Sequence, residues 1–182
     1  MKPIDIEQEL QDLVASEEVL AFFDFTLPPG GGVGAVEGLC KVSRPRERRS
    51  RSTYVSLFFV VDTADAPTRR HVAGHLGRVD WHACGAAMPG VDCVLAIPHR
   101  DAGSDAGLFL KEVDVYLDGS RAPDTKFLRT VLHPAIVKAT GLRSGEITVW
   151  EDAAPATAAA PPGSSTASAT LLTRLRRLTG GG

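Results

Sequence analysis

Apolar side chains recur along this chain with two different spacings, which predict both strands and helices. Runs rich in β-branched and aromatic residues, bounded by proline, glycine or aspartate, predict strands at residues 19–27, 54–62, 92–98, 108–117 and 146–150. Apolar residues three and four positions apart predict amphipathic helices at residues 4–16, 67–83 and 125–140. Residues 35–43 fit either a strand or a short helix.

Aspartate, proline and glycine mark the ends of the predicted helices. Asp65 and Asp124 stand where each of the two longer helices should begin, and their side chains are suited to accept from free backbone amides there. Pro134 should kink or divide the last helix, because proline has no amide hydrogen to donate. Gly141 is suited to the C-terminal cap of the same helix.

The order of these elements predicts the fold class. Between residues 52 and 151 the expected order is strand, helix, strand, strand, helix, strand. This order indicates an α+β protein and fits a ferredoxin-like βαββαβ core. We therefore expect one domain over residues 1–151, with a mixed or antiparallel sheet of about five to six strands and the two longer helices on one face. The preceding helix and strand would extend or cap this core.

The composition changes after residue 151. Residues 152–170 contain no large aliphatic or aromatic side chain, so burial cannot offset the entropy cost of ordering them, and a disordered linker is predicted. Residues 171–182 form a short basic tail in which Leu171, Leu175 and Leu178 share one stripe. We interpret Leu171–Leu178 as a tethered peptide that docks on a partner protein.

Bulk composition limits the class of protein. The formal net charge is −2 and 43% of residues are hydrophobic, which is typical of a globular protein and argues against a nucleic-acid binder. Three cysteines do not make a disulfide framework. There is neither an apolar run near ~18 residues nor a secretory leader, so we expect a cytoplasmic protein without a membrane contact. Abundant alanine, glycine, arginine and proline suggest a bacterial source with a GC-rich genome.

Charge is unevenly distributed along the chain. Residues 1–37 contain eight acidic residues and one lysine, whereas residues 41–51 contain six basic residues and one glutamate. The segment Arg44–Arg51 is predicted to be a solvated loop, because its charges repel one another and it has no apolar side chain to bury. Binding of phosphate or nucleic acid by these arginines is the alternative.

Four basic side chains share one stripe of the helix predicted at residues 67–83: His71, His75, Arg78 and His82. At 100° per residue they lie within about 60° of one another. His71 and His75 have the one-turn spacing that suits a shared metal ion, but a third ligand would have to come from another element. A solvated helix edge is the simpler interpretation.

Two further groups of side chains are candidates for anion binding or acid–base chemistry. Arg78 and His82, and separately Arg100, are candidate anion-binding residues. His99 follows the strand at residues 92–98 and is suited to act as a general base, because imidazole titrates near neutral pH.

A pair of carboxylates is the other catalytic candidate. Glu112, Asp114 and Tyr116 occupy alternate positions of one strand and therefore share a face, with successive side chains about 7 Å apart. That separation suits acid–base work, whereas on a solvated face the same residues would simply contact water.

These patterns support two principal hypotheses about function. The first is an accessory or binding protein whose core binds a small molecule or a protein, while the tail recruits a partner. The alternative is a small bacterial enzyme that acts on an apolar or acyl-type substrate, with His99 or His75 paired with Asp114 or Glu112. Phosphate or nucleic-acid binding through Arg44–Arg51 is a third hypothesis. A homodimer through a sheet edge is consistent with each of the three hypotheses. The sequence identifies no cofactor.

Overall fold

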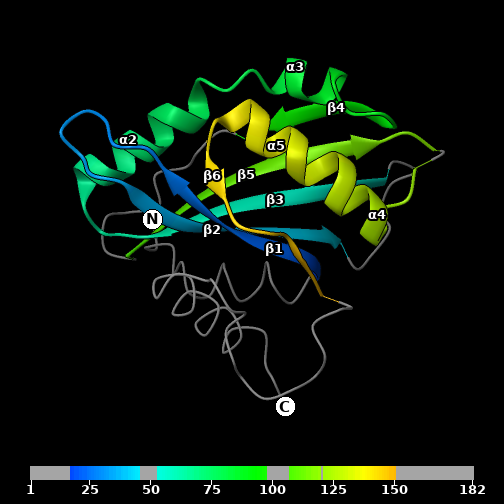
Figure 1. The fold of residues 1–182 in the computed structure, drawn as a ribbon, viewed down its shortest axis with the longest axis horizontal. Helices are drawn as coiled ribbons and strands as arrows, with labels where there is room; N and C mark the ends of the chain where they lie inside the picture. The colour runs from blue at the N-terminus through cyan, green and yellow to red at the C-terminus, as the bar shows by residue number, and fades with distance from the viewer. Residues whose placement is uncertain (1–16, 46–52, 98–106, 120, 151–182) are drawn as a thin grey trace, which may run out of the picture.

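An antiparallel sheet dominates the computed structural model, which describes residues 17–45, 53–97, 107–119 and 121–150 (Figure 1). The strands are β1 (Glu17–Leu27), β2 (Val36–Pro45), β3 (Thr53–Asp62), β4 (Val91–Ala96), β5 (Leu108–Leu117), β6 (Arg143–Ser144) and β7 (Thr148–Val149). The strand order is β4-β5-β3-β2-β1-β6, and β7 also pairs with β1. The sheet curls into a half-barrel. The chain is therefore an α+β protein, as the order of elements predicts.

The strands predicted at residues 19–27, 54–62 and 108–117 are confirmed, and β4 covers most of the strand predicted at residues 92–98. Of the strand predicted at residues 146–150, only Thr148–Val149 is a strand, and residues 36–43 belong to a strand, not a helix. The described sheet has seven strands, more than expected, because β6 and β7 are separate two-residue strands. β1 and β2 form a hairpin. In its connection Gly31 and Gly32 have φ of 60° and 80°, a left-handed conformation that glycine adopts without steric cost.

The sheet order agrees only in part with a ferredoxin-like core. In that arrangement the first strand of the βαββαβ unit lies between the third and the fourth. Here β3 pairs with β5, and β5 with β4, as such a unit requires. The other neighbour of β3 is β2, however, and the last strands β6 and β7 pair with β1 instead. The N-terminal hairpin thus occupies the edge that the final strand of a ferredoxin-like unit would take.

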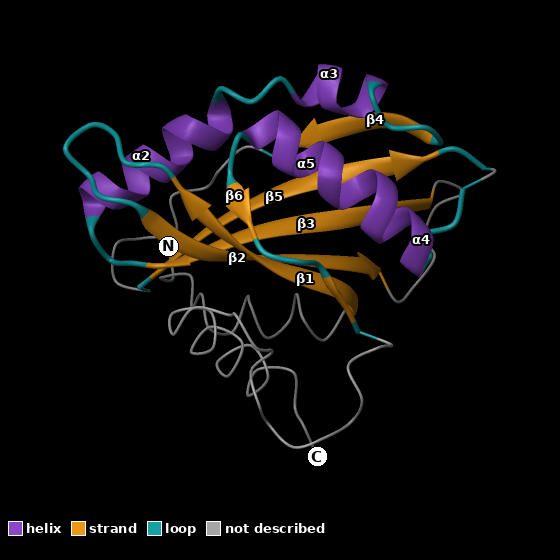
Figure 2. Cartoon of the chain, viewed as in Figure 1, coloured by secondary structure: helices purple, strands orange, loops and turns teal. Residues whose placement is uncertain are grey.

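The described helices form one layer, which packs against the sheet (Figure 2). They are α2 (Ala66–Gly77), α3 (Trp81–Ala86), α4 (Thr125–Phe127), the π-helical turn η2 (Leu128–Leu132) and α5 (His133–Thr140). The side chains of Asp65 and Asp124 accept from the backbone amides of Thr68 and Phe127, which confirms both predicted N-terminal caps. Gly141 ends α5 with φ of 65°, which confirms the predicted C-terminal cap.

The helix predicted at residues 67–83 is wrong as a single element. α2 ends at Gly77, and the carboxylate of Asp80 accepts from the amide of Ala83 to begin α3. This new cap sets which side chains of α3 are buried: Trp81 and Cys84 are buried, whereas Ala83 is exposed. The sequence prediction gave Asp80 no capping role.

Pro134 shapes the last helical region without breaking it. The chain turns through η2 just before Pro134, which occupies the first turn of α5. A π-helical turn widens the helix locally, so the proline ring and its missing amide hydrogen are accommodated. The helix is therefore not divided at the proline. Instead it changes from π-helical to α-helical geometry just before Pro134.

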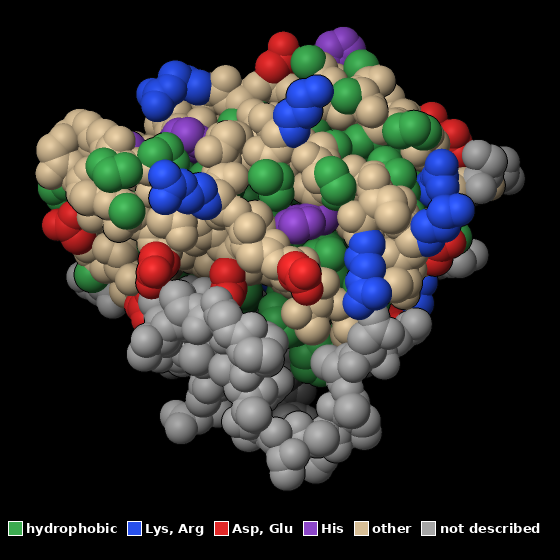
Figure 3. All heavy atoms as spheres, in the orientation of Figure 1, with side chains coloured by type: hydrophobic (Ala, Val, Ile, Leu, Met, Phe, Trp, Pro, Cys, Tyr) green, Lys and Arg blue, Asp and Glu red, His purple; other side chains and the backbone are tan. Residues whose placement is uncertain are grey.

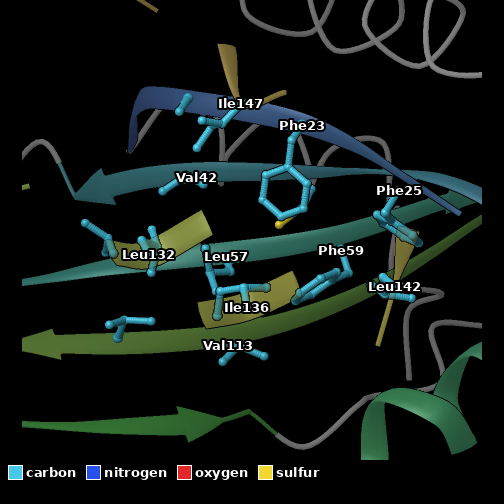
Figure 4. Packing of buried hydrophobic residues seen from close by; sticks show 14 of the residues in the cluster. Phe23, Phe25, Val42, Leu57, Phe59, Val113, Leu132, Ile136, Leu142 and Ile147 are labelled. Carbon is cyan, nitrogen blue, oxygen red and sulfur yellow. The ribbon is translucent and has the colours of Figure 1, made fainter. Parts of the chain in front are cut away.

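One face of the sheet and the helices share the main core. Figure 4 shows Phe23, Phe25 and Phe59 from the strands beside Leu132 and Ile136 from η2 and α5. Val72 and Leu76 of α2, and Trp81 and Cys84 of α3, belong to the same buried cluster. Because strand side chains alternate between faces, these contacts define a first face of the sheet, which packs against the described helices.

The opposite face, called the second face below, has a separate apolar cluster. It consists of Phe22, Leu39, Phe58 and Val60, with Leu108 and Leu110 packed against it. Within the described ranges, no helix is both long and apolar enough to cross a membrane.

Gly38 provides a test of the packing of the first face. A Cβ atom at this position would lie 2.7 Å from the carbonyl oxygen of Val60 and would also clash with the ring of Phe25. We expect Gly38→Ala to lower the free energy of unfolding by about 1–3 kcal/mol in a urea titration. In the matched control Gly74→Ala, the Cβ meets only the Arg78 side chain at 3.6 Å, and the helix should gain up to about 1 kcal/mol. Equal stabilities for the two variants would contradict this packing.

Candidate functional site

Polar side chains gather at one end of the second face. The antiparallel register of β3 and β5 pairs Tyr54 with Tyr116 and Ser56 with Asp114, and it pairs Phe58 with Glu112. Residues two apart on a strand share a face, so all of these side chains lie on the side opposite the helices. Tyr54, Ser56, Glu112, Asp114 and Tyr116 are called the polar cluster below.

Asp114 is the centre of the polar cluster. The hydroxyl of Ser56 donates to its Oδ1 at 2.7 Å, and both residues are buried. Burial raises the pKa of the Asp114 carboxyl, and this effect outweighs the hydrogen bonds from Ser56 and Glu112, which lower it. The carboxyl of Asp114 therefore holds its proton to a higher pH than an exposed aspartate does.

Glu112 brings a second carboxyl group to Asp114. The two side chains are hydrogen-bonded to each other. Two carboxylates that are both ionised repel each other, so such a bond needs a proton on one of them. A cation that approached the pair could take the place of this proton. The pair can thus either exchange a proton or bind a cationic group.

The tyrosines give the polar cluster an aromatic surface. The rings of Tyr54 and Tyr116 are stacked, with centroids 5.2 Å apart. Burial raises the pKa of the Tyr116 phenol, and the nearby charges of Asp114, Cys93 and Glu112 raise it further. Tyr116 therefore remains a neutral hydroxyl that can donate or accept a hydrogen bond near neutral pH.

Glu112, Asp114 and Tyr116 lie together on one face, as their alternation in the sequence predicts. His75 does not join them. Its Nε2 donates to the carbonyl oxygen of Thr140 at 2.7 Å, which ties it to the end of α5 in the helix layer. The sheet separates this histidine from the polar cluster. The other proposed base, His99, lies outside the described residues.

The histidine stripe of α2 and α3 does not converge on one point. Nε2 of His71 lies 2.9 Å from the carbonyl oxygen of Pro28, so His71 and His75 bond to two different parts of the chain. Arg78 and His82 are exposed. Histidines form no single patch on the face drawn in Figure 3. In the part of the chain that the structure describes, no three His, Cys, Asp or Glu side chains are placed to hold a metal ion.

The arginine-rich segment is described only at its start. Nε of Arg44, at the end of β2, lies 2.7 Å from a carboxylate oxygen of Glu18, and both side chains are about half exposed. Residues 46–52, and Arg100 among the anion-binding candidates, lie outside the described residues.

Sequence reasoning missed Tyr54 and Ser56. Both belong to a strand whose next five residues, Leu57–Val61, are apolar, a run that indicates burial on both faces of the sheet. Their role follows from the register with β5, which a single strand pattern does not contain. The one available signal was the polar Ser56 at a position alternating with buried residues.

A buried lysine and a half-buried histidine also went unrecognised. Nζ of Lys111 donates to the carbonyl oxygen of Ile97, and burial lowers the pKa of this lysine. His133 of α5 packs its ring against Phe23, with centroids 4.7 Å apart, and its Nε2 bonds to the hydroxyl of Ser144 at 2.8 Å. Burial lowers the pKa of His133, so it is neutral at pH 7. Both residues have structural partners and lie on the first face or in the helix layer.

Comparison with known proteins gives no functional assignment. No protein-family model, no curated protein sequence and no solved structure matches this chain.

The raised pKa of Asp114 predicts how stability depends on pH. Between the ordinary aspartate pKa and the raised value, the folded state binds more protons than the unfolded state, so stability falls as pH rises through this window. Asp114→Asn removes this penalty, because its amide can accept from Ser56 and donate to Glu112 without a charge. We expect the variant to be at least as stable as the parent protein at pH 7 in a thermal unfolding series, with the difference vanishing near pH 3.

Asp114→Ala is the control for that series. Loss of the acceptor would leave the buried hydroxyl of Ser56 without its partner, which should cost about 1–3 kcal/mol at every pH. An Asn variant as unstable as the Ala variant at pH 7 would contradict the assignment of a proton-holding carboxyl pair.

Proposed function

We propose that this protein is a binding protein, and that a partner protein contacts the polar cluster on the second face. The observation that carries the proposal is the Glu112–Asp114 carboxyl pair, which lies beside a stacked tyrosine pair on the face that the described helices leave free. The geometry supports binding better than catalysis because no described histidine reaches this pair.

The charge of this face indicates the chemistry of the partner. Carboxyl groups outnumber cations on the described part of the second face: Asp24, Glu37, Glu112 and Asp114 lie there with Lys41. The ammonium of Lys41 lies over the ring of Phe58, 4.6 Å from its centroid. The face is therefore complementary to a basic segment.

An arginine side chain fits this arrangement well. Its planar guanidinium can donate to two carboxylate oxygens and also stack on an aromatic ring. In the same row as Asp114, Leu95 of the edge strand β4 is 50% exposed and offers an apolar contact. We therefore propose that the partner presents a basic amphipathic segment, with its arginines toward the carboxyl pair and its leucines toward Leu95.

The C-terminal tail is proposed as a second contact with the partner. Its residues lie outside the described ranges, so its part in the proposal rests on the leucine stripe of Leu171–Leu178 and its arginines. The described chain ends at Trp150, which is 43% exposed and whose ring contacts Phe22 of the second face. A flexible linker of about twenty residues has a typical end-to-end distance of roughly 25 Å, which would let the tail act near this face.

A peptide binding experiment tests the partner chemistry. The probe is a labelled peptide of residues 169–182, which is basic and has the leucine stripe, and the protein is the chain ending at Asp152. We expect saturable binding by fluorescence anisotropy that weakens roughly 10-fold or more in Glu112→Gln/Asp114→Asn, because charge-assisted hydrogen bonds contribute about 1.5–3 kcal/mol. Binding should also weaken as salt concentration rises.

Glu146→Gln is the matched control, because Glu146 is an exposed acid outside the polar cluster. It should leave the dissociation constant unchanged, and a peptide with each arginine replaced by glutamate should not bind. Equal affinities for the double variant and this control would contradict the proposed site. Weaker binding of the peptide to the full chain than to the shortened one would show that the tail occupies the site in cis.

Deletion of residues 153–182 tests the role of the tail. We expect the melting temperature to remain within about 2 °C of that of the full chain, because a difference below 1 kcal/mol moves it by only a few degrees in a protein of this size. The shortened chain should lose binding to the partner, and the full chain with Leu175→Asp should lose it too. Proteins captured with the full chain would be purified and their affinities for both forms compared by calorimetry. Equal affinities would refute the proposal for the tail.

An acid–base enzyme is the second candidate, favoured by one observation: burial raises the pKa of the Asp114 carboxyl beside Glu112. Asp114 would then act as the general acid and Glu112 as the general base. Turnover of acyl esters that is abolished by Asp114→Asn would favour this candidate over binding alone.

A further inference from the structure

The apolar cluster of the second face is buried, yet no described helix packs against it. Phe22 is 5% exposed, Leu39 0%, Phe58 1% and Val60 3%. The side chains of the described helices belong to the cluster on the first face. Side chains this far from water must be covered by some part of the chain or a partner, and each would forgo about 1.5–3 kcal/mol of burial free energy if it were exposed. This cluster therefore calls for a covering element.

The cluster has the dimensions of one short helix. Two adjacent cross-strand rows form it: Phe22, Lys41 and Phe58 in one, and Leu39, Val60 and Leu110 in the other. Neighbouring strands lie about 4.8 Å apart, so the rows extend over roughly 15 Å from β1 to β5. A helix of twelve residues is about 18 Å long.

The residues directly before β1 have the matching pattern. Ile6, Leu10, Leu13 and Val14 lie on one side of the helix predicted at residues 4–16. β1 begins at Glu17, so only two residues separate Val14 from the strand. So short a connection brings a helix back over its own strand or that strand's neighbours. The first face is already occupied by the described helices, which leaves the second face.

Charge also favours this segment over the tail. Asp5, Glu7, Glu9 and Asp12 surround its apolar stripe, and the ammonium of Lys41 lies over the Phe58 ring of the cluster. The tail is basic and is joined through some twenty residues, so its local concentration near the face would be far lower. Its chemistry suits the acidic polar cluster better than the apolar rows.

We propose that residues 4–16 form an amphipathic helix that docks on the second face and covers Phe22, Leu39, Phe58 and Val60. The helix completes a second hydrophobic layer and confines partner binding to the polar cluster at the end of the same face. Docking of this segment does not depend on the binding function proposed above.

A pair of matched double variants of the full chain tests the docking. In Leu10→Asp/Leu13→Asp the helix should leave the face, so fluorescence of the dye ANS should rise several-fold and the melting temperature should fall by roughly 5–10 °C. Leu175→Asp/Leu178→Asp, in the tail, should change neither. If only the tail variant raised ANS fluorescence and lowered the melting temperature, the face would be assigned to the tail. If neither variant changed these two quantities, the proposal would also be overturned.

A paramagnetic label tests the docking without disturbing the apolar stripe. The label is attached at Asp12→Cys in a Cys93→Ser background, because Cys40 and Cys84 are buried and do not react. Methyl signals of Leu39 and Val60 should broaden, while those of Val72 and Leu76 on the first face should not. A label at Thr173→Cys should have no such effect.

Two results of this experiment would overturn the proposal. Broadening of Leu39 and Val60 only by the label at residue 173 would assign the face to the tail. Broadening only when labelled chains are mixed with unlabelled, isotope-enriched chains would assign it to a second copy of the protein. Because the label reports position and not affinity, neither result bears on whether the polar cluster binds a basic peptide.

Discussion

The register between β3 and β5 is the constraint on which most of this structure depends. It pairs ten consecutive residues, from Thr53 with Leu117 to Asp62 with Leu108. A shift of β5 by one residue against β3 would turn Asp114 into the core and expose Val113, because side chains alternate with a period of two. Burial of Phe59 and Val113 on the first face therefore fixes the polar cluster on the second.

The two faces differ in how polar groups are tolerated. On the first face a buried cation such as Lys111 is bonded to the backbone carbonyl of Ile97, in keeping with a structural role. On the second face the buried carboxyl of Asp114 bonds to a hydroxyl and to a second carboxyl, although burial disfavours its charge. A buried carboxyl costs more free energy to bury than an apolar side chain, so its presence here is more consistent with recognition than with stability.

Local patterns and tertiary contacts contributed differently to the fold. Alternation along residues 19–27 and 108–117 predicts strands that the structure contains, and the caps at Asp65, Asp124 and Gly141 follow from local hydrogen bonding and backbone geometry. The break between α2 and α3 was missed because Asp80 competes with helix continuation only when Trp81 and Cys84 can be buried. The placement of β2 beside β3 was likewise not visible, since strand order depends on which edges meet in space.

The sequence by itself determined the type and approximate limits of most elements, the α+β class, and the shared face of Glu112, Asp114 and Tyr116, because these follow from the period of side chains along one segment. Only the tertiary structure decided the strand order, the addition of Tyr54 and Ser56 to that face, and the separation of His75 from it. Pairing and packing join residues far apart in the chain, and the free energy that selects one pairing is a property of the whole core and not of any single pattern.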